Sequence, residues 1–374
     1  MGKRSSKVPR KKPHRSPKRS PVKAESRAPK IKRDALADYE QAISKDGCVE
    51  VLSLADEGCL ANVPLHISTQ SVELDRLLNG RGIPCGRITE IFGPPHIGKS
   101  TLLDHIFASV QKIGGIGILI DTEGARDVRY SQSIGVDPKK LRYLEFNRDA
   151  LHIENILTKI METVDFWTAR APEMPIAIGW DALGGTATRD ELDGKLEKGE
   201  RPAQAARVMR TACRQLPGRL GNTKIALVVC NHEYENIQMG FMAGKVGKKR
   251  ETYGGEAIRH LATLRIKLFP AGWIKRADGA IIGREVGVQL VKNRLGSPWG
   301  EARMALLSGI GVDNVWSIYQ RLAVAKLITV AGGWAAVNLD GKVLKFQGWS
   351  GLAEKCREDS TLFSRLLSVY QSLG

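Results

Sequence analysis

A chain of 374 residues, 42% of them hydrophobic, is long enough for one large core and a small additional unit. No apolar run approaches the length of a membrane span, and the N-terminus lacks the apolar core of a signal peptide. Neither a membrane protein nor a secreted precursor is therefore expected, and the net charge of +17 directs attention to anionic partners.

The six cysteines include no C-x-x-C pair and no spacing typical of a metal site. Such a pattern is typical of a reducing compartment, where cysteines serve as small core residues. Disulfides and zinc ligands are the less favoured alternatives.

Residues 1–33 form a basic tail with fourteen Lys or Arg side chains and one acid, Glu25, which gives the segment a charge of +13. It contains five prolines and very few apolar residues, so it cannot bury enough surface to fold and we expect disorder. Because cationic side chains release counterions from nucleic-acid phosphates, a nucleic-acid-binding arm is the favoured interpretation. A solubilising arm and a localisation signal are the alternatives.

Order is predicted to begin near Asp34, with a short helical stripe over 34–44. A strand over 87–92 then leads into a glycine-rich loop, and apolar residues along 100–113 share one face of a helix. A strand–helix alternation follows, with strands over 116–121, 141–146, 175–181 and 224–231 and helices over 151–170 and 202–216.

The periodicity changes in the last third of the chain. Segments 261–269, 285–293 and 302–308 alternate or run apolar without intervening helices, as expected of antiparallel strands that extend a parallel sheet. Residues from about 311 onward read as a small separate unit. The sequence thus predicts an α/β fold, a mostly parallel sheet flanked by helices with an antiparallel extension. We place a tail at 1–33, an N-terminal element at 34–66, the core at 67–311 and a C-terminal α/β domain at 312–374.

The segment GPPHIGKST has the outline G-x-x-x-x-G-K-[ST] of a phosphate-binding loop, and it lies between a strand and an amphipathic helix as that mechanism requires. Lys99 would contact the β- and γ-phosphates of a nucleotide, and the Ser100 hydroxyl would bind Mg²⁺. The candidate nucleotide-binding residues are Gly93, Pro94, Pro95, His96, Ile97, Gly98, Lys99, Ser100 and Thr101.

Two prolines in this loop remove two N–H donors. The loss is tolerable because the amides that surround the β-phosphate come mainly from the later part of such a loop, here 97–101. His96 is expected to be a solvated loop residue rather than a catalytic one.

Two carboxylates follow predicted strands. Asp181 comes after an apolar strand, at the carboxyl end where ligands bind in such sheets, so we expect it to hold Mg²⁺ through water; a helix or turn cap is the alternative. Glu123 ends the strand ILIDTE and could orient and deprotonate an attacking water. Two such carboxylates beside a phosphate loop predict ATP hydrolysis.

These motifs together resemble the RecA family of DNA recombinases, over roughly residues 64–374 and most specifically over 67–131 and 175–300. The entry segment ISTQSVELDRLLNGRGIPCGRITEIFGPPHIGKST and the segment GGIGILIDTEGARDVRYSQSIGVD carry the likeness. The resemblance implies a RecA-like P-loop ATPase core and a polymerisation element within 34–66. It also implies that Glu123 is the catalytic glutamate and that Asp127 and Tyr130 contact the adenine base.

The segment VVCNHEYEN is similar to the family strand that carries the γ-phosphate sensor, which makes His232 the sensor. Bacterial members have glutamine there, whereas phage-type members resemble this chain in having histidine. A strand-end histidine in a polar turn is the alternative. QLVKNRLGSP resembles the stretch whose two cations reach a neighbouring subunit's ATP, which assigns that role to Lys292 and Arg294.

Two DNA-binding loops are implied by the resemblance, near 185–203 and 233–253. The chemistry of the second agrees, since cations on a glycine-broken loop can neutralise phosphates without reading bases; a solvated charge run is the alternative. The segments ARVMRTACRQL and YGGEAIRHLATLRI are similar to family segments beside these loops. The candidate DNA-binding residues are Arg207, Lys245, Lys248, Lys249, Arg250, Gly254, Gly255 and Arg259.

The resemblance implies an ATP-dependent recombinase that forms a helical filament on single-stranded DNA, pairs it with homologous double-stranded DNA and exchanges strands, with ATP and Mg²⁺ as cofactors. The alternatives are a ring helicase or motor on the same fold, and an ATP-switched, DNA-coating regulatory paralogue. Mediator or single-strand-binding proteins are further candidate partners, and no membrane is expected. The expected location is cytoplasmic, at the nucleoid, or in the host cytoplasm if the chain is phage-encoded.

Overall fold

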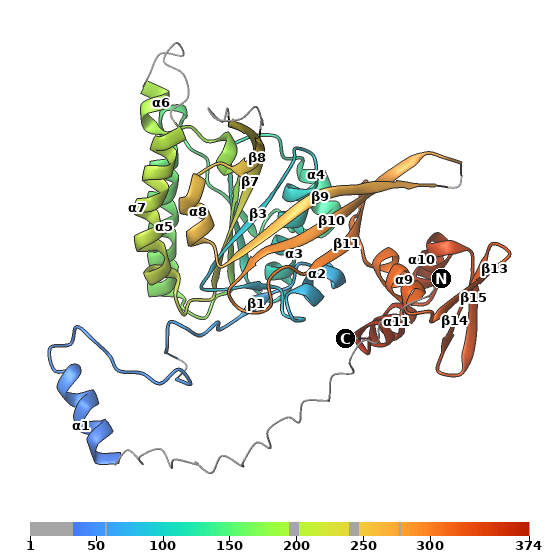
Figure 1. Cartoon of the computed structure of the whole chain (residues 1–374), viewed down its shortest axis with the longest axis horizontal. Helices are drawn as coiled ribbons and strands as arrows, with labels where there is room; N and C mark the ends of the chain where they lie inside the picture. The colour runs from blue at the N-terminus through green and yellow to red at the C-terminus, as the bar shows by residue number, and fades with distance from the viewer. Residues whose placement is uncertain (1–32, 57, 194–201, 239–246, 277, 374) are drawn as a thin grey trace, which may run out of the picture. The chain divides into compact units, whose positions relative to one another are not determined.

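The computed structural model describes residues 33–56, 58–193, 202–238, 247–276 and 278–373 (Figure 1). Two compact units make up the chain, 1–53 and 54–374. The described part of the first unit contains helix α1 (Arg33–Ile43), which falls where a helical stripe was predicted and exposes Leu36, Tyr39 and Ile43. Within the described residues, every helix is too short or too polar to span a membrane.

A large sheet organises the second unit, with strand order β12-β11-β10-β9-β3-β7-β6-β4-β5. Its parallel part consists of β3 (Ile88–Gly93), β4 (Ile116–Asp121), β5 (Leu141–Tyr143), β6 (Ile176–Asp181) and β7 (Ile225–Gln238). Strand β9 (Leu264–Lys275) runs parallel to β3, and the antiparallel strands that follow it are β10 (Ile281–Asn293), β11 (Glu301–Leu307) and β12 (Gly311–Asp313). The predicted parallel sheet with an antiparallel extension is confirmed.

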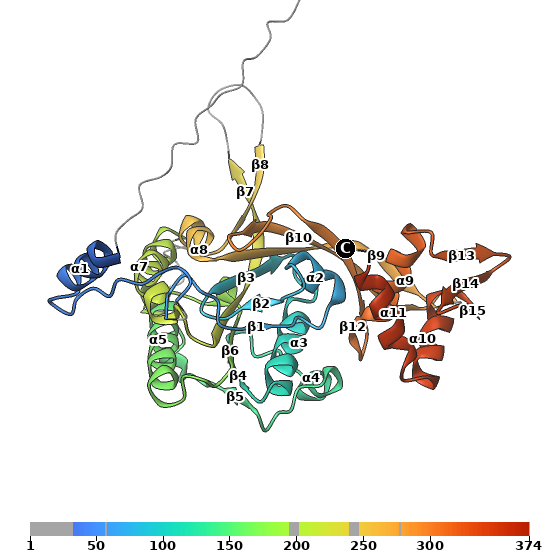
Figure 2. The same ribbon diagram turned by 90° about the horizontal axis from the view of Figure 1, so that it is seen from below.

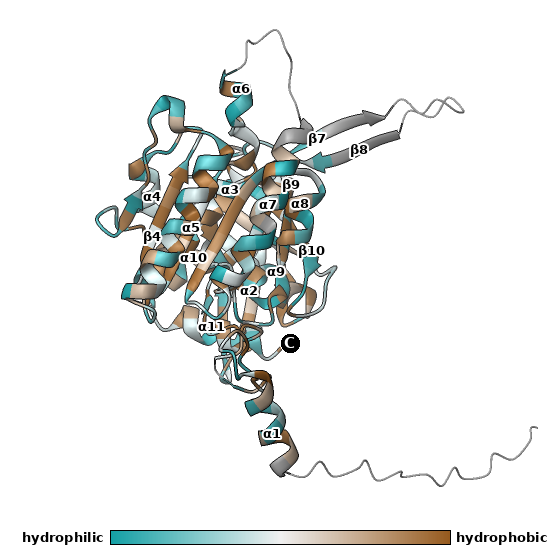
Figure 3. Cartoon of the chain, turned by 90° about the vertical axis from the view of Figure 1, so that its left-hand side faces the viewer, coloured by the Kyte–Doolittle hydropathy of each residue, from teal (hydrophilic) through white to brown (hydrophobic). Residues whose placement is uncertain are grey.

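Helices cover both faces of the parallel strands, which is why these strands read as unbroken apolar runs. On one face α3 (Lys99–Lys112) packs on side chains such as Leu119 and Val228. On the other face, side chains such as Ile120 and Val229 contact α5 (Ile153–Arg170), α7 (Pro202–Leu220) and α8 (Gly255–Leu261). Figure 2 shows α5 and α7 on one side of the sheet and α3 on the other, and Figure 3 shows apolar strands between helices with polar outer faces.

Shorter elements connect these layers. They are β1 (His66–Ile67), α2 (Val72–Leu77), β2 (Ile83–Pro84), α4 (Val128–Ile134), the 3₁₀ turns at Arg148–Ala150 and Leu183–Gly185, and α6 (Arg189–Asp193).

The structure corrects two expectations. Residues 233–253 are not an irregular loop throughout, because 233–238 of β7 pair antiparallel with β8 (Gly247–Thr252). This pairing is made by backbone groups and leaves no periodic apolar signal in the sequence. Helix α8 was also missed, since its seven residues are too few to show a clear period; Gly254, with φ of 82°, starts it, and Ala257, Ile258 and Leu261 are buried.

The C-terminal residues form helices α9 (Asn314–Val324), α10 (Gly348–Glu358) and α11 (Leu362–Gln371) beside a three-stranded sheet of β13 (Ile328–Ala331), β14 (Trp334–Leu339) and β15 (Lys342–Phe346). They have a hydrophobic cluster of their own. They nevertheless belong to the same compact unit as the large sheet, and the Tyr370 hydroxyl donates to the Glu73 carboxylate on α2 at 2.9 Å.

A buried histidine joins α3 to the sheet extension. His105 Nε2 accepts a hydrogen bond from the Val312 N–H at 2.8 Å, so its other ring nitrogen, Nδ1, carries the proton and donates to Gln70 Oε1 at 3.1 Å. The contact at Nε2 requires the neutral imidazole, because a protonated ring nitrogen cannot accept a hydrogen bond. Burial, with a smaller contribution from the Lys112 charge, lowers the pKa of His105 to about 4.

This histidine should make the protein acid-sensitive. Because its folded pKa lies below the unfolded value of about 6.5, the unfolded state takes up the proton first, and stability falls as the pH drops from about 6.5 towards 4. Between pH 7.5 and 4.5 the loss due to His105 is expected to be about 2 to 3 kcal/mol. Denaturant unfolding at both pH values measures it. The His105→Leu variant should lose correspondingly less over the same range, and an equal loss in both proteins would contradict the assignment.

Candidate active site

The phosphate loop connects the end of β3 to the start of α3. Gly98, with φ of 100°, forms the N-cap of α3, and a Cβ added to it would lie 2.1 Å from Leu306 Cδ1 on β11. The left-handed backbone favours glycine here, and a larger residue would also require Leu306 to move. The free N–H groups of the first turn of α3 provide an anion-binding position beside the loop.

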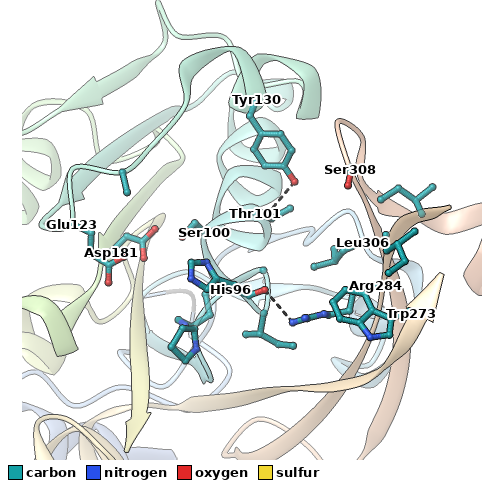
Figure 4. Close-up of a pocket in the computed structure, with 18 of the residues that line it drawn as sticks. His96, Ser100, Thr101, Glu123, Tyr130, Asp181, Trp273, Arg284, Leu306 and Ser308 are labelled. Atoms are coloured by element: carbon teal, nitrogen blue, oxygen red, sulfur yellow. Dashed lines mark hydrogen bonds between the residues drawn. The ribbon is translucent and has the colours of Figure 1, made fainter. Parts of the chain in front are cut away.

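A cavity of about 600 Å³ opens over this loop (Figure 4). The predicted site residues that line it are Pro95, His96, Ile97, Gly98, Lys99, Ser100, Thr101, Glu123, Tyr130, Asp181 and His232. Gly93, Pro94 and Asp127 are not among the lining residues. The carbonyls of Gly93 and Pro94 accept hydrogen bonds from Lys99 Nζ at 3.3 and 3.0 Å. The Asp127 carboxylate caps α4 by accepting from the Arg129 N–H.

Lys99, His232 and Glu123 form a chain of polar contacts across the cavity. Lys99 Nζ lies 3.4 Å from His232 Nδ1, and His232 Nε2 lies 2.6 Å from Glu123 Oε1. An ammonium group can only donate, so Nδ1 accepts and the Nε2–H group donates to the carboxylate. Burial lowers the pKa of Lys99, while nearby acidic groups act in the opposite direction. The ammonium that would meet a phosphate is thus linked to the candidate general base through His232.

The donors for a metal lie in the same cavity. Asp181, at the end of β6, is buried, and the Ser100 hydroxyl is at the start of α3. Hard oxygen ligands of this kind fit Mg²⁺, which is commonly bound by one or two protein oxygens together with substrate phosphates. No cluster of three or more His, Cys, Asp or Glu side chains that could hold a metal occurs among the described residues.

Sequence reasoning missed the wall of the cavity formed by β9, β10 and β11. Trp273 and Arg284 are cross-strand partners, and the Arg284 guanidinium lies 4.4 Å from the Trp273 ring centroid. Arg284 Nη1 also donates to the His96 carbonyl at 3.3 Å, so it adds a second cation to the cavity besides Lys99. No local motif marks these residues. They reach the loop because the antiparallel strands return to it.

The sequence of this chain is similar to those of known proteins. A family model described as the RecA N-terminal domain matches residues 30–313, about three quarters of the chain. The chain belongs to the RecA family. It is 32% identical to Protein RecA of Aquifex pyrophilus over 303 residues, which is 80% of this chain and 80% of that protein. It is 30% identical to Protein RecA of Delftia acidovorans over 352 residues, 94% of this chain and 89% of that protein.

The family assignment confirms the RecA fold implied by the sequence motifs. The matched RecA model ends at Asp313, the N-cap of α9. The Delftia alignment is longer than that match, so it must include most of the residues outside 30–313. The likeness to RecA therefore extends into the small terminal elements.

Within the described residues, the candidates for DNA contact lie on β8, on α7 and at α8. Gly254 and Gly255 begin α8, and Arg259 on this helix forms ion pairs with Glu256 and Glu251 at 2.5 and 3.8 Å. Arg207 is exposed on α7. Lys248, Lys249 and Arg250 belong to β8, but their side chains lie outside the described residues, as do Lys245 and residues 194–201 of the first predicted loop.

The last two RecA-family candidates, Lys292 and Arg294, lie far from the cavity of their own chain. Lys292 on β10 pairs with Arg265 of β9, and Asn293 pairs with Leu264, which aligns with Thr89 near the start of β3. The phosphate loop follows the other end of β3. Lys292 Nζ donates to the carbonyls of Arg259 and His260 at 2.6 and 3.0 Å, and burial followed by the nearby Arg294 and Arg265 charges lowers its pKa to about 8.

Proposed function

We propose that this RecA-family protein is an ATP-dependent DNA recombinase, which forms filaments on single-stranded DNA, pairs it with a homologous duplex and exchanges strands with DNA-dependent ATP hydrolysis. RecA-family proteins are in general DNA-dependent ATPases that assemble into filaments. The observation that carries the proposal is strand β7. It bears His232 in the cavity and continues, from Glu233, into the hairpin with β8.

ATP would bind with its phosphates at the loop and the N-terminus of α3, where Lys99 neutralises part of their charge. Ser100 and Asp181 would hold Mg²⁺, which supplies positive charge to the β- and γ-phosphate oxygens. Glu123 would orient a water and accept its proton, since its carboxylate faces the same cavity. A γ-phosphate at Lys99 would draw the ammonium and the His232 ring towards it, and the hydrogen bond between His232 and Glu123 would open.

A buried network would pass this change to the hairpin. Asn231 Oδ1 accepts from the His232 N–H at 2.9 Å, and Asn231 Nδ2 donates to Glu90 Oε1 and to the Tyr253 carbonyl, each at 2.9 Å. Tyr253 follows β8, and its ring lies 4.8 Å from that of Tyr234 on β7. A shift of His232 therefore acts on both strands at the base of the hairpin.

Lys292 and Arg294 would serve the ATP of the adjacent subunit. Their place at the opposite end of the strands from the phosphate loop supports this role rather than one at their own nucleotide. A cation supplied across an interface stabilises the charge on the transferring phosphoryl group, so hydrolysis would depend on assembly. We propose that α1 contributes to the same assembly and that the protein acts in the cytoplasm.

A strand-exchange assay tests the proposal. Filaments formed with ATP on single-stranded DNA should convert a homologous duplex into exchanged product and leave a heterologous duplex intact, and single-stranded DNA should stimulate ATP hydrolysis. Exchange with both duplexes, or with neither, would refute a homology-dependent recombinase. Electron microscopy of the same mixture should show helical filaments. Closed six-membered rings would instead favour a ring motor, and ATP-dependent coating without exchange would favour a regulatory paralogue.

A further inference from the structure

Arg126 connects the candidate metal carboxylate to a second buried acid. It lies between Ala125, which lines the cavity, and Asp127, the N-cap of α4. Its Nη2 donates to Asp181 Oδ2 at 3.1 Å, and its Nη1 donates to Asp104 Oδ1. The side chains are 11% exposed for Arg126, 8% for Asp181 and 3% for Asp104, so the three charges interact with little solvent between them.

Asp104 on α3 holds Arg126 in this position. Its second oxygen accepts from the Ser131 hydroxyl at 2.9 Å, which fixes the carboxylate between α3 and α4. Burial raises the pKa of Asp104, while the Arg126 charge lowers it. The Arg126 guanidinium also lies 6.0 Å from the Phe107 ring centroid. The arginine is thus anchored by residues that do not line the nucleotide cavity.

The geometry is more than a local ion pair would need. Asp104 alone would neutralise the charge of Arg126, but the guanidinium also reaches Asp181 on β6. In this position its buried Nε has no hydrogen-bond partner within the described residues. Leaving a buried N–H donor unpaired costs free energy. The contacts of Arg126 with the two carboxylates must offset this cost. One oxygen of Asp181 is therefore already occupied by a cation.

We propose that Arg126 is a positioning residue that holds Asp181 and weakens its attraction for Mg²⁺, so that the metal is retained only together with a nucleotide. This rests on the proposed function of the cavity as a Mg²⁺–nucleotide site. The guanidinium and the metal would compete for the same carboxylate. With Arg126 in place, part of the attraction of the Asp181 carboxylate for Mg²⁺ is cancelled. The phosphates of the nucleotide must supply the rest of the attraction that holds the metal.

The test uses the charge-neutral double variant Asp104→Leu/Arg126→Leu of the full chain. Binding of a fluorescent methylanthraniloyl-ATP is titrated with Mg²⁺ and repeated in EDTA. Without the competing cation, the Mg²⁺ concentration at half-maximal binding should fall about fivefold, the scale of one screened charge–charge interaction. Binding in EDTA should stay within about twofold of wild type, because the loop and Lys99 are unchanged. A merely structural role would change both measurements or neither.

Asp165→Leu/Arg219→Leu, which removes an exposed ion pair outside the cavity, is the matched control and should leave the Mg²⁺ midpoint unchanged. If the Asp104→Leu/Arg126→Leu variant does not fold, Asp104→Asn/Arg126→Gln gives the same test. Its amides keep hydrogen-bonding groups in place but carry no charge, so the midpoint should still fall. An unchanged or higher midpoint in a folded variant overturns the proposal. Failure of wild type to bind the nucleotide with or without Mg²⁺ would instead overturn the proposed function.

Discussion

Replacement of Lys99 by alanine is expected to abolish strand exchange and to lower ATP hydrolysis by at least about a hundredfold, the usual cost of losing one cation aimed at a transferring phosphoryl group. Lys99 is buried at the phosphate loop, within contact distance of the sensor candidate His232. The substitution removes the positive charge that would neutralise the phosphates. It also removes the contact with His232 through which Lys99 is linked to Glu123. Steady-state hydrolysis with and without single-stranded DNA measures the first effect, and the strand-exchange assay measures the second.

The matched control is Lys112→Ala, which removes an exposed lysine from the last turn of the same helix. It should hydrolyse ATP and exchange strands as wild type does. Thermal unfolding of both variants separates a folding defect from a catalytic one. Wild-type turnover in a folded Lys99→Ala protein would exclude the cavity as the site of hydrolysis.

The second large effect is expected from Lys292→Ala/Arg294→Ala. Because these residues lie at the sheet edge opposite the phosphate loop, the variant should bind ATP within about twofold of wild type but lose about a hundredfold or more in hydrolysis. Mixing it with Lys99→Ala should restore ATP hydrolysis. The Lys292/Arg294 variant supplies an intact phosphate loop, and the Lys99→Ala variant supplies the intact cations. In a random equimolar filament about a quarter of the head-to-tail interfaces combine an intact loop with intact cations.

Two controls accompany the mixing experiment. Arg294→Ala alone leaves the contacts of Lys292 with the end of α8 in place, so it separates the charge contribution from a structural one. Lys342→Ala/Lys345→Ala removes two exposed lysines from β15 and should have no effect on hydrolysis. Activity that stays absent in the mixture, with both variants folded and bound to DNA, would contradict the exchange of cations between subunits.

The parts of the site that could be predicted from the sequence are those whose function is encoded locally. The phosphate loop is contiguous, and strand and helix patterns flank it. Glu123 and Asp181 follow parallel strands, whose carboxyl ends must meet at one edge of the sheet. The strands of the large sheet were also predictable from local sequence, because a strand buried on both faces is apolar throughout.

The remaining parts depend on contacts between distant segments. Arg284 and Trp273 reach the cavity through the register of β9 and β10, which no local pattern specifies. Arg126 could not be singled out from the sequence, because its two acidic partners come from α3 and β6. The β7–β8 hairpin was mistaken for a loop because backbone pairing, rather than a buried apolar face, holds its strands together.

Strand β7 also has a mechanical property. Its residues 233–238, paired with β8, extend about 20 Å beyond His232 at ~3.4 Å per residue. The strand can therefore act as a lever, with His232 in the nucleotide cavity and the hairpin residues as its long arm. A tilt of about 5° at its base would move Gln238 by about 2 Å, on the order of half the spacing between neighbouring strands. Changes at the phosphate that are too small to reshape the core would thus be magnified at the far end of the strand.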